Sequence, residues 1–330
     1  MWRLIFFFFF PIGICAQQRF QFTESKMGSP FTIIFYDSDS THAQFCATES
    51  FQLVDSLNEI FSDYSPTSEI SLLLNNKGDT NIILSNELLE IIVRAKAAYK
   101  KSNRAFDITM GALSQLWRNA KAENRFPSKK EIKSVKKKTG FNNISINEKN
   151  KTILFRKEGR RFDFGGIVKG YATEKVIDYL KSKNINSALV DAGGDIAMSS
   201  PPPGKTGWTV AMNLPERGDE TWESKLKLSN RSVATSGDVY QYTLHKEKKY
   251  SHIINPRTGY GVTNLRNVTV IAGDGATADW LATACSILSI KKAKKLVLKE
   301  KAELFIAQQN TSSIKIYKTA GFDQFISKKD

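Results

Sequence analysis

Two glycine pairs, each close to acidic residues, occur in the run from 160 to 198 and set the strongest constraint on the fold. A predicted strand ends at Asp163 and is followed by the first pair, at 165–166. An amphipathic helix is predicted next, because apolar residues recur three and four positions apart from 168 to 180. A second predicted strand ends at the other pair, at 193–194. The sequence therefore predicts a strand–turn–helix–strand unit with glycines and acids at both turns.

The first glycine pair also offers a place for an anion. Glycine allows backbone conformations closed to other residues and lets a ligand approach the main chain. The turn at 165–166 begins a helix, whose first amides have no partner within the helix and carry partial positive charge, so phosphate oxygens bind well there. A tight structural turn is the alternative interpretation. The segment contains neither the dinucleotide fingerprint G-x-G-x-x-G nor a P-loop.

Residues 1–17 have the layout of a secretory signal. One positive charge precedes an apolar stretch at 4–14, and small or polar residues follow at 15–17. The apolar stretch is too short to remain as a comfortable membrane span. We therefore expect cleavage near residue 17 and an exported, periplasmic protein whose single domain spans 18–330. Lipid attachment at Cys15 is the alternative, and it would hold the protein at the membrane.

Two cysteines follow the signal, Cys46 and Cys285, each within an apolar helical stretch. Pairing is open to an exported protein. A chain of 330 residues that is 41% apolar can bury a large core without a disulfide. We therefore expect both thiols to be free and buried.

The formal net charge of +15 comes largely from two lysine-rich helices predicted at 129–138 and 291–301. Apolar residues recur on one side of each helix, so the lysines are expected to form solvated faces. Peripheral association with an anionic membrane surface, or with an acidic partner, is the next interpretation. Nucleic acid is not expected as a partner, because the chain is exported and lacks interleaved aromatic and basic residues.

Short strands dominate the chain after residue 198, and they follow one another too closely for parallel crossovers. Antiparallel pairing, and hence an α+β fold, is predicted. The predicted strands are 31–36, 143–147, 151–156, 208–212, 224–228, 232–234, 239–244, 250–254, 267–272, 304–307 and 314–317. Further helices are predicted at 41–61, 85–102 and 276–288.

Among the three histidines, His252 is the strongest candidate for chemistry. It lies in Y-S-H-I-I-N-P-R-T-G-Y-G, where a predicted strand ends at a proline and glycine turn. A histidine at such a position can act as a base, an acid or a ligand, although a structural role stays open. His42, at a helix start, and His245, in a lysine-rich hairpin, are expected at the surface.

A second candidate site lies on the helix predicted at 276–288. Asp279 and Thr283 are four residues apart and therefore share one helix face. A carboxylate in so apolar a helix is costly unless a positive group meets it. A salt bridge to lysine or arginine would suffice, and a hard cation such as Mg²⁺ or Ca²⁺ is the alternative. No cluster of cysteine and histidine suits zinc.

The polar loop at 62–69 carries one aromatic residue, Tyr64. An exposed tyrosine there can stack on a flat ligand, or it can cover the edge of the core. The sequence favours neither interpretation.

Eight short motifs follow one another between residues 27 and 288. They are M-G-S at 27–29, S-D-Y-S-P-T-S-E at 62–69, A-F-D-I-T-M-G-A-L at 105–113, D-F-G-G-I-V-K-G-Y-A at 163–172, A-G-G-D-I at 192–196, A-T-S-G-D at 234–238, H-I-I-N-P-R-T-G at 252–259 and A-D-W-L-A-T-A at 278–284. As an ordered set they resemble the ApbE family, the FAD:protein FMN transferases.

The resemblance implies a T-fold-like α+β enzyme that binds FAD and a divalent cation, usually Mg²⁺. Such enzymes transfer FMN from FAD to a serine or threonine hydroxyl of an acceptor flavoprotein through a phosphoester bond, and they release AMP. The implied acceptors are flavoprotein subunits of membrane redox complexes. Metal-dependent hydrolysis of FAD to FMN and AMP, and non-catalytic flavin carriage, are the alternatives.

Site residues follow from the resemblance by position. The implied FAD contacts are Met27, Tyr64, Ala105, Phe106, Asp107, Asp163, Lys169 and His252. The implied metal ligands are the Gly166 carbonyl, Asp279 and Thr283, and the implied catalytic residues are His252 and Asp279. His252 would take the proton from the acceptor hydroxyl. Gly166 is therefore expected to lie against the Asp279 and Thr283 face. Asn255 stands where the family more often has aspartate, which puts a hydrogen bond near His252 in question.

Overall fold

The computed structural model describes residues 17–75, 81–155, 159–212, 224–237, 242–310 and 313–327. Residues 1–16 of the predicted signal, including Cys15, lie outside these ranges. So do residues 239–241 of the strand predicted at 239–244. Within the described residues, no helix combines the length and apolar character that a bilayer crossing requires.

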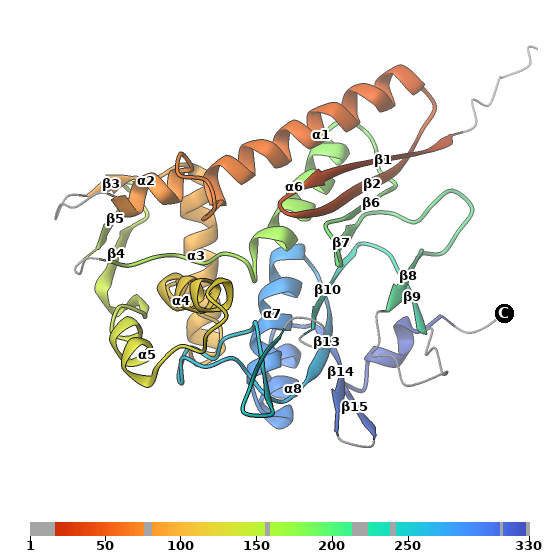
Figure 1. Cartoon of the computed structure of the whole chain (residues 1–330). Helices are drawn as coiled ribbons and strands as arrows, with labels where there is room; N and C mark the ends of the chain where they lie inside the picture. Colours follow the sequence, from red (N-terminus) through yellow and green to blue (C-terminus); the bar gives the residue numbers. More distant parts are fainter. Residues whose placement is uncertain are drawn as a thin grey trace, which may run out of the picture.

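One eight-stranded sheet forms the centre of the molecule (Figure 1). All of its neighbouring strands pair antiparallel, so the predicted α+β architecture is confirmed. In spatial order the strands are β1 (Gln18–Lys26), β2 (Ser29–Asp37), β6 (Ala188–Asp191), β7 (Asp195–Met198), β10 (Arg231–Gly237), β13 (Arg266–Ala272), β14 (Glu303–Gln309) and β15 (Ile314–Lys318). Every residue of β13 is buried, as expected for an inner strand covered on both faces.

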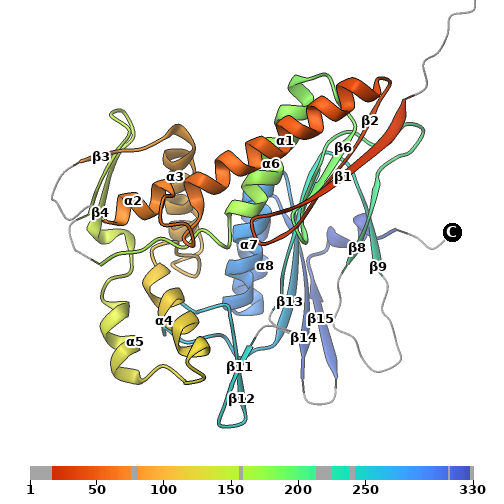
Figure 2. The same cartoon turned by 45° about the horizontal axis from the view of Figure 1, so that its top comes forward.

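Helices cover one face of this sheet, and Figure 2 shows them as a layer beside the strands. The covering helices are α1 (Ser40–Phe61), α6 (Val168–Ser182), α7 (Gly275–Ile287) and α8 (Ile290–Lys299). The opposite face is covered by a smaller sheet of β8 (Trp208–Met212) and β9 (Ser224–Leu228), with a second apolar cluster between the two sheets. The result is three layers around two cores.

A group of helices and short strands lies beside these layers. It contains α2 (Glu69–Asn75), α3 (Asn86–Lys101), α4 (Gly111–Ala122) and α5 (Lys129–Lys136). A three-stranded sheet accompanies them, in the order β3 (Ile82–Ile83), β5 (Thr152–Phe155) and β4 (Ile144–Asn147). The hairpin of β11 (Tyr242–His245) and β12 (Lys248–Ser251) forms a separate two-stranded sheet.

The central unit of the sequence folds largely as predicted, with one correction. Helix α6 follows the first glycine pair, and β6 ends two residues before the second. The strand predicted to end at Asp163 is wrong, because Arg161 forms only an isolated parallel bridge to Met110. That segment pairs with a loop instead of a strand, so its pairing cannot propagate.

Other predictions from residue type are confirmed. Ser128 and Glu131 form a capping box on α5. The apolar sides of α5 and α8 are buried and most of their lysines are exposed. Cys46 and Cys285 are free thiols, and both are buried. Burial raises the pKa of the Cys285 thiol to about 12.

Helices α6 and α7 touch through two glycines. A Cβ atom on Gly170 would lie 2.1 Å from the carbonyl oxygen of Gly275, and one on Gly275 would lie 2.0 Å from the carbonyl oxygen of Gly170. No side chain fits at either position. This contact sets the distance between the start of α6 and the face of α7 that carries Asp279.

Gly170→Ala is therefore expected to lower the free energy of unfolding by about 3 kcal/mol, because the methyl group forces the two backbones apart. Urea denaturation followed by circular dichroism would measure the change. Gly273→Ala is the matched control, since a Cβ there meets nothing within 4 Å. It should change stability by less than about 1 kcal/mol. Equal effects in the two variants would contradict the packing argument.

Candidate active site

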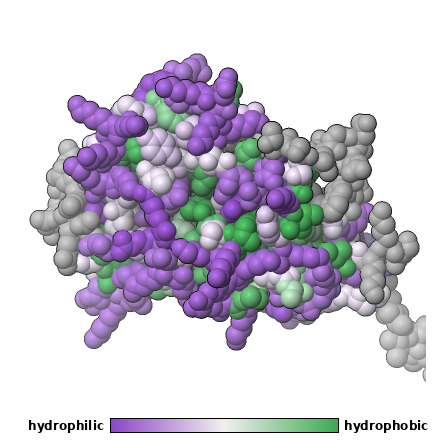
Figure 3. Space-filling model, turned by 90° about the horizontal axis from the view of Figure 1, so that it is seen from below, coloured by the Kyte–Doolittle hydropathy of each residue, from purple (hydrophilic) through white to green (hydrophobic). Residues whose placement is uncertain are grey.

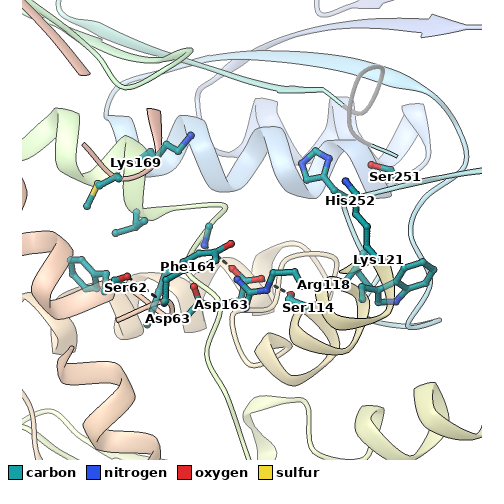
Figure 4. Close-up of a pocket in the computed structure, with 18 of the residues that line it drawn as sticks. Ser62, Asp63, Ser114, Arg118, Lys121, Asp163, Phe164, Lys169, Ser251 and His252 are labelled. Atoms are coloured by element: carbon teal, nitrogen blue, oxygen red, sulfur yellow. Dashed lines mark hydrogen bonds and ion pairs between the residues drawn. The ribbon is translucent and has the colours of Figure 1, made fainter. Parts of the chain in front are cut away.

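A cavity of about 790 Å³ opens where five segments of the chain meet. Its walls come from the turn after β1, the end of α1 with the loop that follows, one face of α4, and residues 163–169. The base of the β11–β12 hairpin with residues 251–254 closes the remaining side. Figure 4 shows Lys169 and His252 on opposite sides of this space. Five of the predicted FAD contacts line it: Met27, Tyr64, Asp163, Lys169 and His252.

Backbone hydrogen bonds bring two distant motifs together beneath the cavity. The N–H of Asp163 donates to the carbonyl of Ile108 at 2.7 Å, and the N–H of Gly111 donates to the carbonyl of Arg161 at 3.1 Å. A Cβ atom on Gly111 would lie 2.4 Å from the carbonyl oxygen of Phe162, so only glycine allows this approach. The A-F-D-I-T-M-G and D-F-G-G motifs thus form one continuous wall.

Both carboxylate oxygens of Asp163 are held in place. Oδ1 accepts the N–H of Gly165 at 2.9 Å, which closes the glycine turn on itself. Oδ2 accepts the hydroxyl of Ser114 at 2.5 Å, from the cavity face of α4 (Figure 4). With its rotamer fixed at both oxygens, Asp163 presents a defined hydrogen-bond acceptor to the cavity.

The structure places the predicted metal ligands next to one another. A Cβ atom on Gly166 would lie 2.7 Å from Oγ1 of Thr283. One helical turn earlier on α7, Oδ2 of Asp279 accepts the N–H of Gly170 at 3.2 Å. The side chain of Asp279 is 6% exposed, and no ion pair among the described residues includes it. The salt-bridge alternative for Asp279 therefore finds no support.

The charges around Asp279 suit a cation. Burial raises the pKa of Asp279 well above its ordinary value, and the nearby Asp195 carboxylate raises it further. The hydrogen bond from the N–H of Gly170 and the positive charge of Lys169 lower the pKa by less. Burial also raises the pKa of Asp195, against the effect of Lys169. Both shifts show that the charged forms of these two carboxyl groups are costly here, and a bound cation would stabilise those forms.

The oxygen donors themselves fit Mg²⁺ better than zinc. The described residues include no group of three or more histidine, cysteine, aspartate or glutamate side chains able to hold a metal. Asp279, the hydroxyl of Thr283 and the carbonyl of Gly166 provide one carboxylate and two neutral oxygens. Mg²⁺ commonly binds in this way, with phosphate oxygens of the substrate and water completing the shell.

His252 lies at the cavity edge, directly after β12, and is exposed. Its neighbours Ser251 and Ile253 are buried, and the Ser251 hydroxyl oxygen accepts the N–H of Ile253 at 3.0 Å. The following turn is closed by Asn255, whose Oδ1 accepts the N–H of Arg257 at 2.9 Å. An aspartate oxygen would accept the same bond, so the asparagine preserves the turn beside His252.

Tyr64 does not cover the core, because 80% of it is exposed. The Arg118 guanidinium lies over its ring, 4.7 Å from the centroid, and forms an ion pair with Asp63. Burial lowers the pKa of Arg118, but Asp63 and Tyr64 raise it by more. The ring is therefore held at the cavity, as required for stacking on a flat ligand.

Ala105, Phe106 and Asp107 are buried and do not line the cavity. The ring of Phe106 packs against Trp280 of α7, with centroids 6.2 Å apart. Oδ1 of Asp107 accepts the N–H of Thr109 at 2.9 Å and its hydroxyl at 2.6 Å. Their contact with FAD stays a prediction, and their visible role is to support the wall.

The motifs missed the cavity face of α4, as well as the hairpin residues Tyr242, Thr243 and Ser251 that also line the cavity. Ser114, Trp117, Arg118 and Lys121 all line the cavity. Their spacing of three and four residues would have placed them on one helix face. The mixture of polar, aromatic and basic residues on that face was the available signal.

Comparisons with known proteins agree with this site. A family model of the ApbE family matches residues 27–306, and the chain belongs to that family. An FAD:protein FMN transferase of Chlamydia muridarum is 28% identical over 318 residues, which cover 94% of this chain and 98% of that protein. One from Klebsiella pneumoniae is 26% identical over 274 residues, or 83% and 84% of the two chains.

A solved structure supports the same conclusion about the fold. The crystal structure of an ApbE protein from Thermotoga maritima is 30% identical in sequence and superposes with a TM-score of 0.83. The match covers 94% of this chain and 100% of that one. The predicted ApbE-like fold is confirmed.

Asp107 gives the metal-free protein a testable pH dependence. Burial raises its pKa, and the bonds from Thr109 only partly oppose this. Folded Asp107 therefore keeps its proton at pH values above 3.8, where the unfolded chain has lost it. Its contribution to the free energy of unfolding should fall as the pH rises through this window.

Asp107→Asn should make the fall of the unfolding free energy above pH 3.8 less steep, measured by urea titrations at successive pH values. Asp195 and Asp279, whose pKa values are also raised, keep part of the slope. Asp178→Asn, which changes an exposed carboxylate of α6, is the control and should keep the wild-type slope. An unchanged slope in Asp107→Asn would show that this carboxyl is not the group responsible.

Proposed function

We propose that this chain is an FAD:protein FMN transferase that moves FMN from FAD to a serine or threonine hydroxyl of an acceptor protein and releases AMP. The observation that carries the proposal is the placement of the glycine turn at 165–166 against the Asp279 and Thr283 face, beside a cavity that also presents Lys169 and His252. Membership of the ApbE family and the activity named for its relatives support it.

The reaction breaks the phosphoanhydride bond between the FMN and AMP halves of FAD and forms a phosphoester bond to the acceptor. The acceptor hydroxyl oxygen attacks the FMN phosphorus, and the bond from that phosphorus to the bridging oxygen breaks. The bridging oxygen leaves as part of AMP. His252 takes the proton of the hydroxyl, which its exposed position at the cavity edge allows. The phosphate of the departing AMP carries the negative charge that develops on the former bridging oxygen.

Other residues around the cavity would bind and orient FAD. Lys169, in the first turn of α6, supplies positive charge near the buried carboxylates and the diphosphate. Asp163 accepts hydrogen bonds from a ligand at a fixed position, and Tyr64 offers its free ring face to a flat ring system. The N–H groups of Val168 and Gly170 in the first turn of α6 already donate to the Phe164 carbonyl and to Asp279, so the Lys169 side chain, more than the helix amides, would meet the phosphates.

Asp279, Thr283 and the carbonyl of Gly166 would hold a divalent cation, which we propose to be Mg²⁺. When bound, such a cation neutralises the diphosphate and stabilises the charge on the leaving AMP. The two neutral oxygens and one carboxylate leave coordination positions for phosphate oxygens.

The cellular setting is also a proposal. The signal layout of residues 1–17 supports export to the periplasm, with attachment to the membrane if Cys15 is lipidated. The acceptors would be flavoprotein subunits of membrane redox complexes. The exposed lysines of α5 and α8 would favour an anionic membrane surface.

One experiment tests the activity. The protein is incubated with FAD, Mg²⁺ and a candidate acceptor, and AMP release and acceptor mass are followed. AMP together with flavin bound covalently to the acceptor is the expected result. AMP with free FMN would indicate hydrolysis, and neither product would indicate a carrier; each would overturn the proposal.

Two variants separate the roles of the base and the metal ligand. His252→Ala should slow transfer about 100-fold or more, because the hydroxyl loses its proton acceptor. Its FAD affinity, measured by flavin fluorescence, should stay close to that of the wild type. Asp279→Ala should abolish metal-dependent turnover and also remove the effect of Mg²⁺ on FAD affinity. Full activity in Asp279→Ala would remove the metal assignment.

A further inference from the structure

The β11–β12 hairpin has an anchored face and a free face. On the anchored side, the ring of His245 stacks on Phe126 with centroids 4.0 Å apart and planes 12° apart. Tyr250 also packs on Phe126, at 4.9 Å. Because successive side chains of a strand point to opposite faces, Tyr242, Leu244 and Lys249 belong to the other face. The hairpin is thus fixed to the α4–α5 region by one face only.

The free face forms a strip of four residues that runs into the cavity. Leu244 pairs directly with Lys249, and Tyr242 pairs with Ser251, one step closer to the base of the hairpin. Tyr242 and Ser251 line the cavity, and His252 follows them in the chain. We call Tyr242, Leu244, Lys249 and Ser251 the hairpin strip.

The outer part of the hairpin strip is apolar and uncovered. Leu244 is 63% exposed and Tyr242 is 37% exposed. The ammonium group of Lys249 lies 4.5 Å from the Tyr242 ring centroid, so the ring is held against the strand by a cation. Single exposed apolar residues are ordinary at a protein surface, but an aliphatic and an aromatic residue leading into a cavity are not.

Other exposed apolar side chains lack this connection. Apart from Tyr64, the remaining ones are Phe45, Leu72, Ile83, Leu298 and Ile316. None of these five lines the cavity. The hairpin strip therefore differs from these five residues in that it continues into the cavity.

Positive charge surrounds the hairpin strip. The hairpin carries Lys246, Lys248 and Lys249 against one acid, Glu247. No ion pair among the described residues uses these lysines. Lys121 adds a further cation on the α4 side of the cavity.

Figure 3 shows the face toward which the hairpin projects. Hydrophobic groups lie near the middle of this face and hydrophilic groups surround them. An apolar centre within a polar rim is typical of a protein interaction surface.

The transfer reaction requires such a surface. Its second substrate is a protein, and a cavity of about 790 Å³ that also receives FAD has no room for a folded domain. The acceptor must therefore lie on the rim and insert only the segment that bears the hydroxyl. That segment has to reach His252, which terminates the hairpin strip.

We propose that the hairpin strip is the docking surface for the acceptor protein. It recognises an extended segment that places an aliphatic side chain on Leu244 and Tyr242 and an acidic side chain near Lys249, with the reacting hydroxyl at His252. This inference rests on the proposed transferase function. The aliphatic contact supplies binding affinity for the acceptor. The lysines orient the acceptor and increase its rate of association.

Leu244→Ser and Lys249→Glu test the docking surface, with an acceptor that the wild-type enzyme modifies. At saturating FAD, the KM for the acceptor should rise about tenfold in each variant, the effect of losing one well-placed interface contact. The kcat and the FAD affinity should stay within about twofold of the wild type, since neither side chain takes part in the chemistry.

Leu298→Ser and Lys295→Glu on α8 are the matched controls, because both positions are exposed and neither lines the cavity. They should leave the KM for the acceptor unchanged. In Lys249→Glu, a lysine in place of the acceptor's acidic residue nearest the hydroxyl should restore the KM.

The outcomes separate this inference from the proposed function. Normal transfer with an unchanged KM in both hairpin variants would overturn the docking surface and leave the transferase function intact. An equal rise in KM in the α8 variants would overturn it as well, since general charge or solubility would then explain the effect. Failure of the wild-type enzyme to modify any acceptor would overturn the proposed function and the docking surface with it.

Discussion

The site depends on the contact between two glycines in neighbouring helices. Gly170 and Gly275 allow α6 and α7 to meet backbone to backbone, and the N–H of Gly170 donates to Asp279 across the contact. The turn that precedes α6 is thereby fixed against Thr283. A side chain at either glycine would separate the glycine turn before α6 from the face of α7 that carries Asp279 and Thr283.

An ionic network holds the same contact from its outer side. Arg94 of α3 donates to Glu174 of α6 at 3.0 Å and forms an ion pair with Asp274, the N-cap of α7. Glu174 also accepts the N–H of Ala276 at 3.3 Å. One arginine thus joins three helices. Among the described residues, neither Asp279 nor Asp195 forms an ion pair of this kind, unlike Glu174 and Asp274.

The two parts of the proposed site are built differently. The inner part consists of the glycine turn and the α7 face packed behind it, which lies outside the cavity lining, and its oxygen donors suit a cation. The outer part is built from exposed groups, Tyr64 with Arg118 on one side and the hairpin strip on the other. In our proposal FAD contacts both parts, with its phosphates at the inner one and its ring system at Tyr64, whereas the protein acceptor reaches only the outer one.

Local patterns in the sequence were sufficient for most elements and for the chemistry of the inner part of the site. Periodicity gave α1, α3, α6 and α7, and the motifs gave Asp163, Gly166, Asp279 and His252. The predicted strand ending at Asp163 failed because its partner, the loop at Met110, is not a strand. Residue identity thus determined which groups could bind phosphate, a cation or a proton. Only the tertiary structure decided which of them meet, because the approach of α6 to α7, the cavity face of α4 and the free face of the hairpin all depend on contacts between segments far apart in the chain.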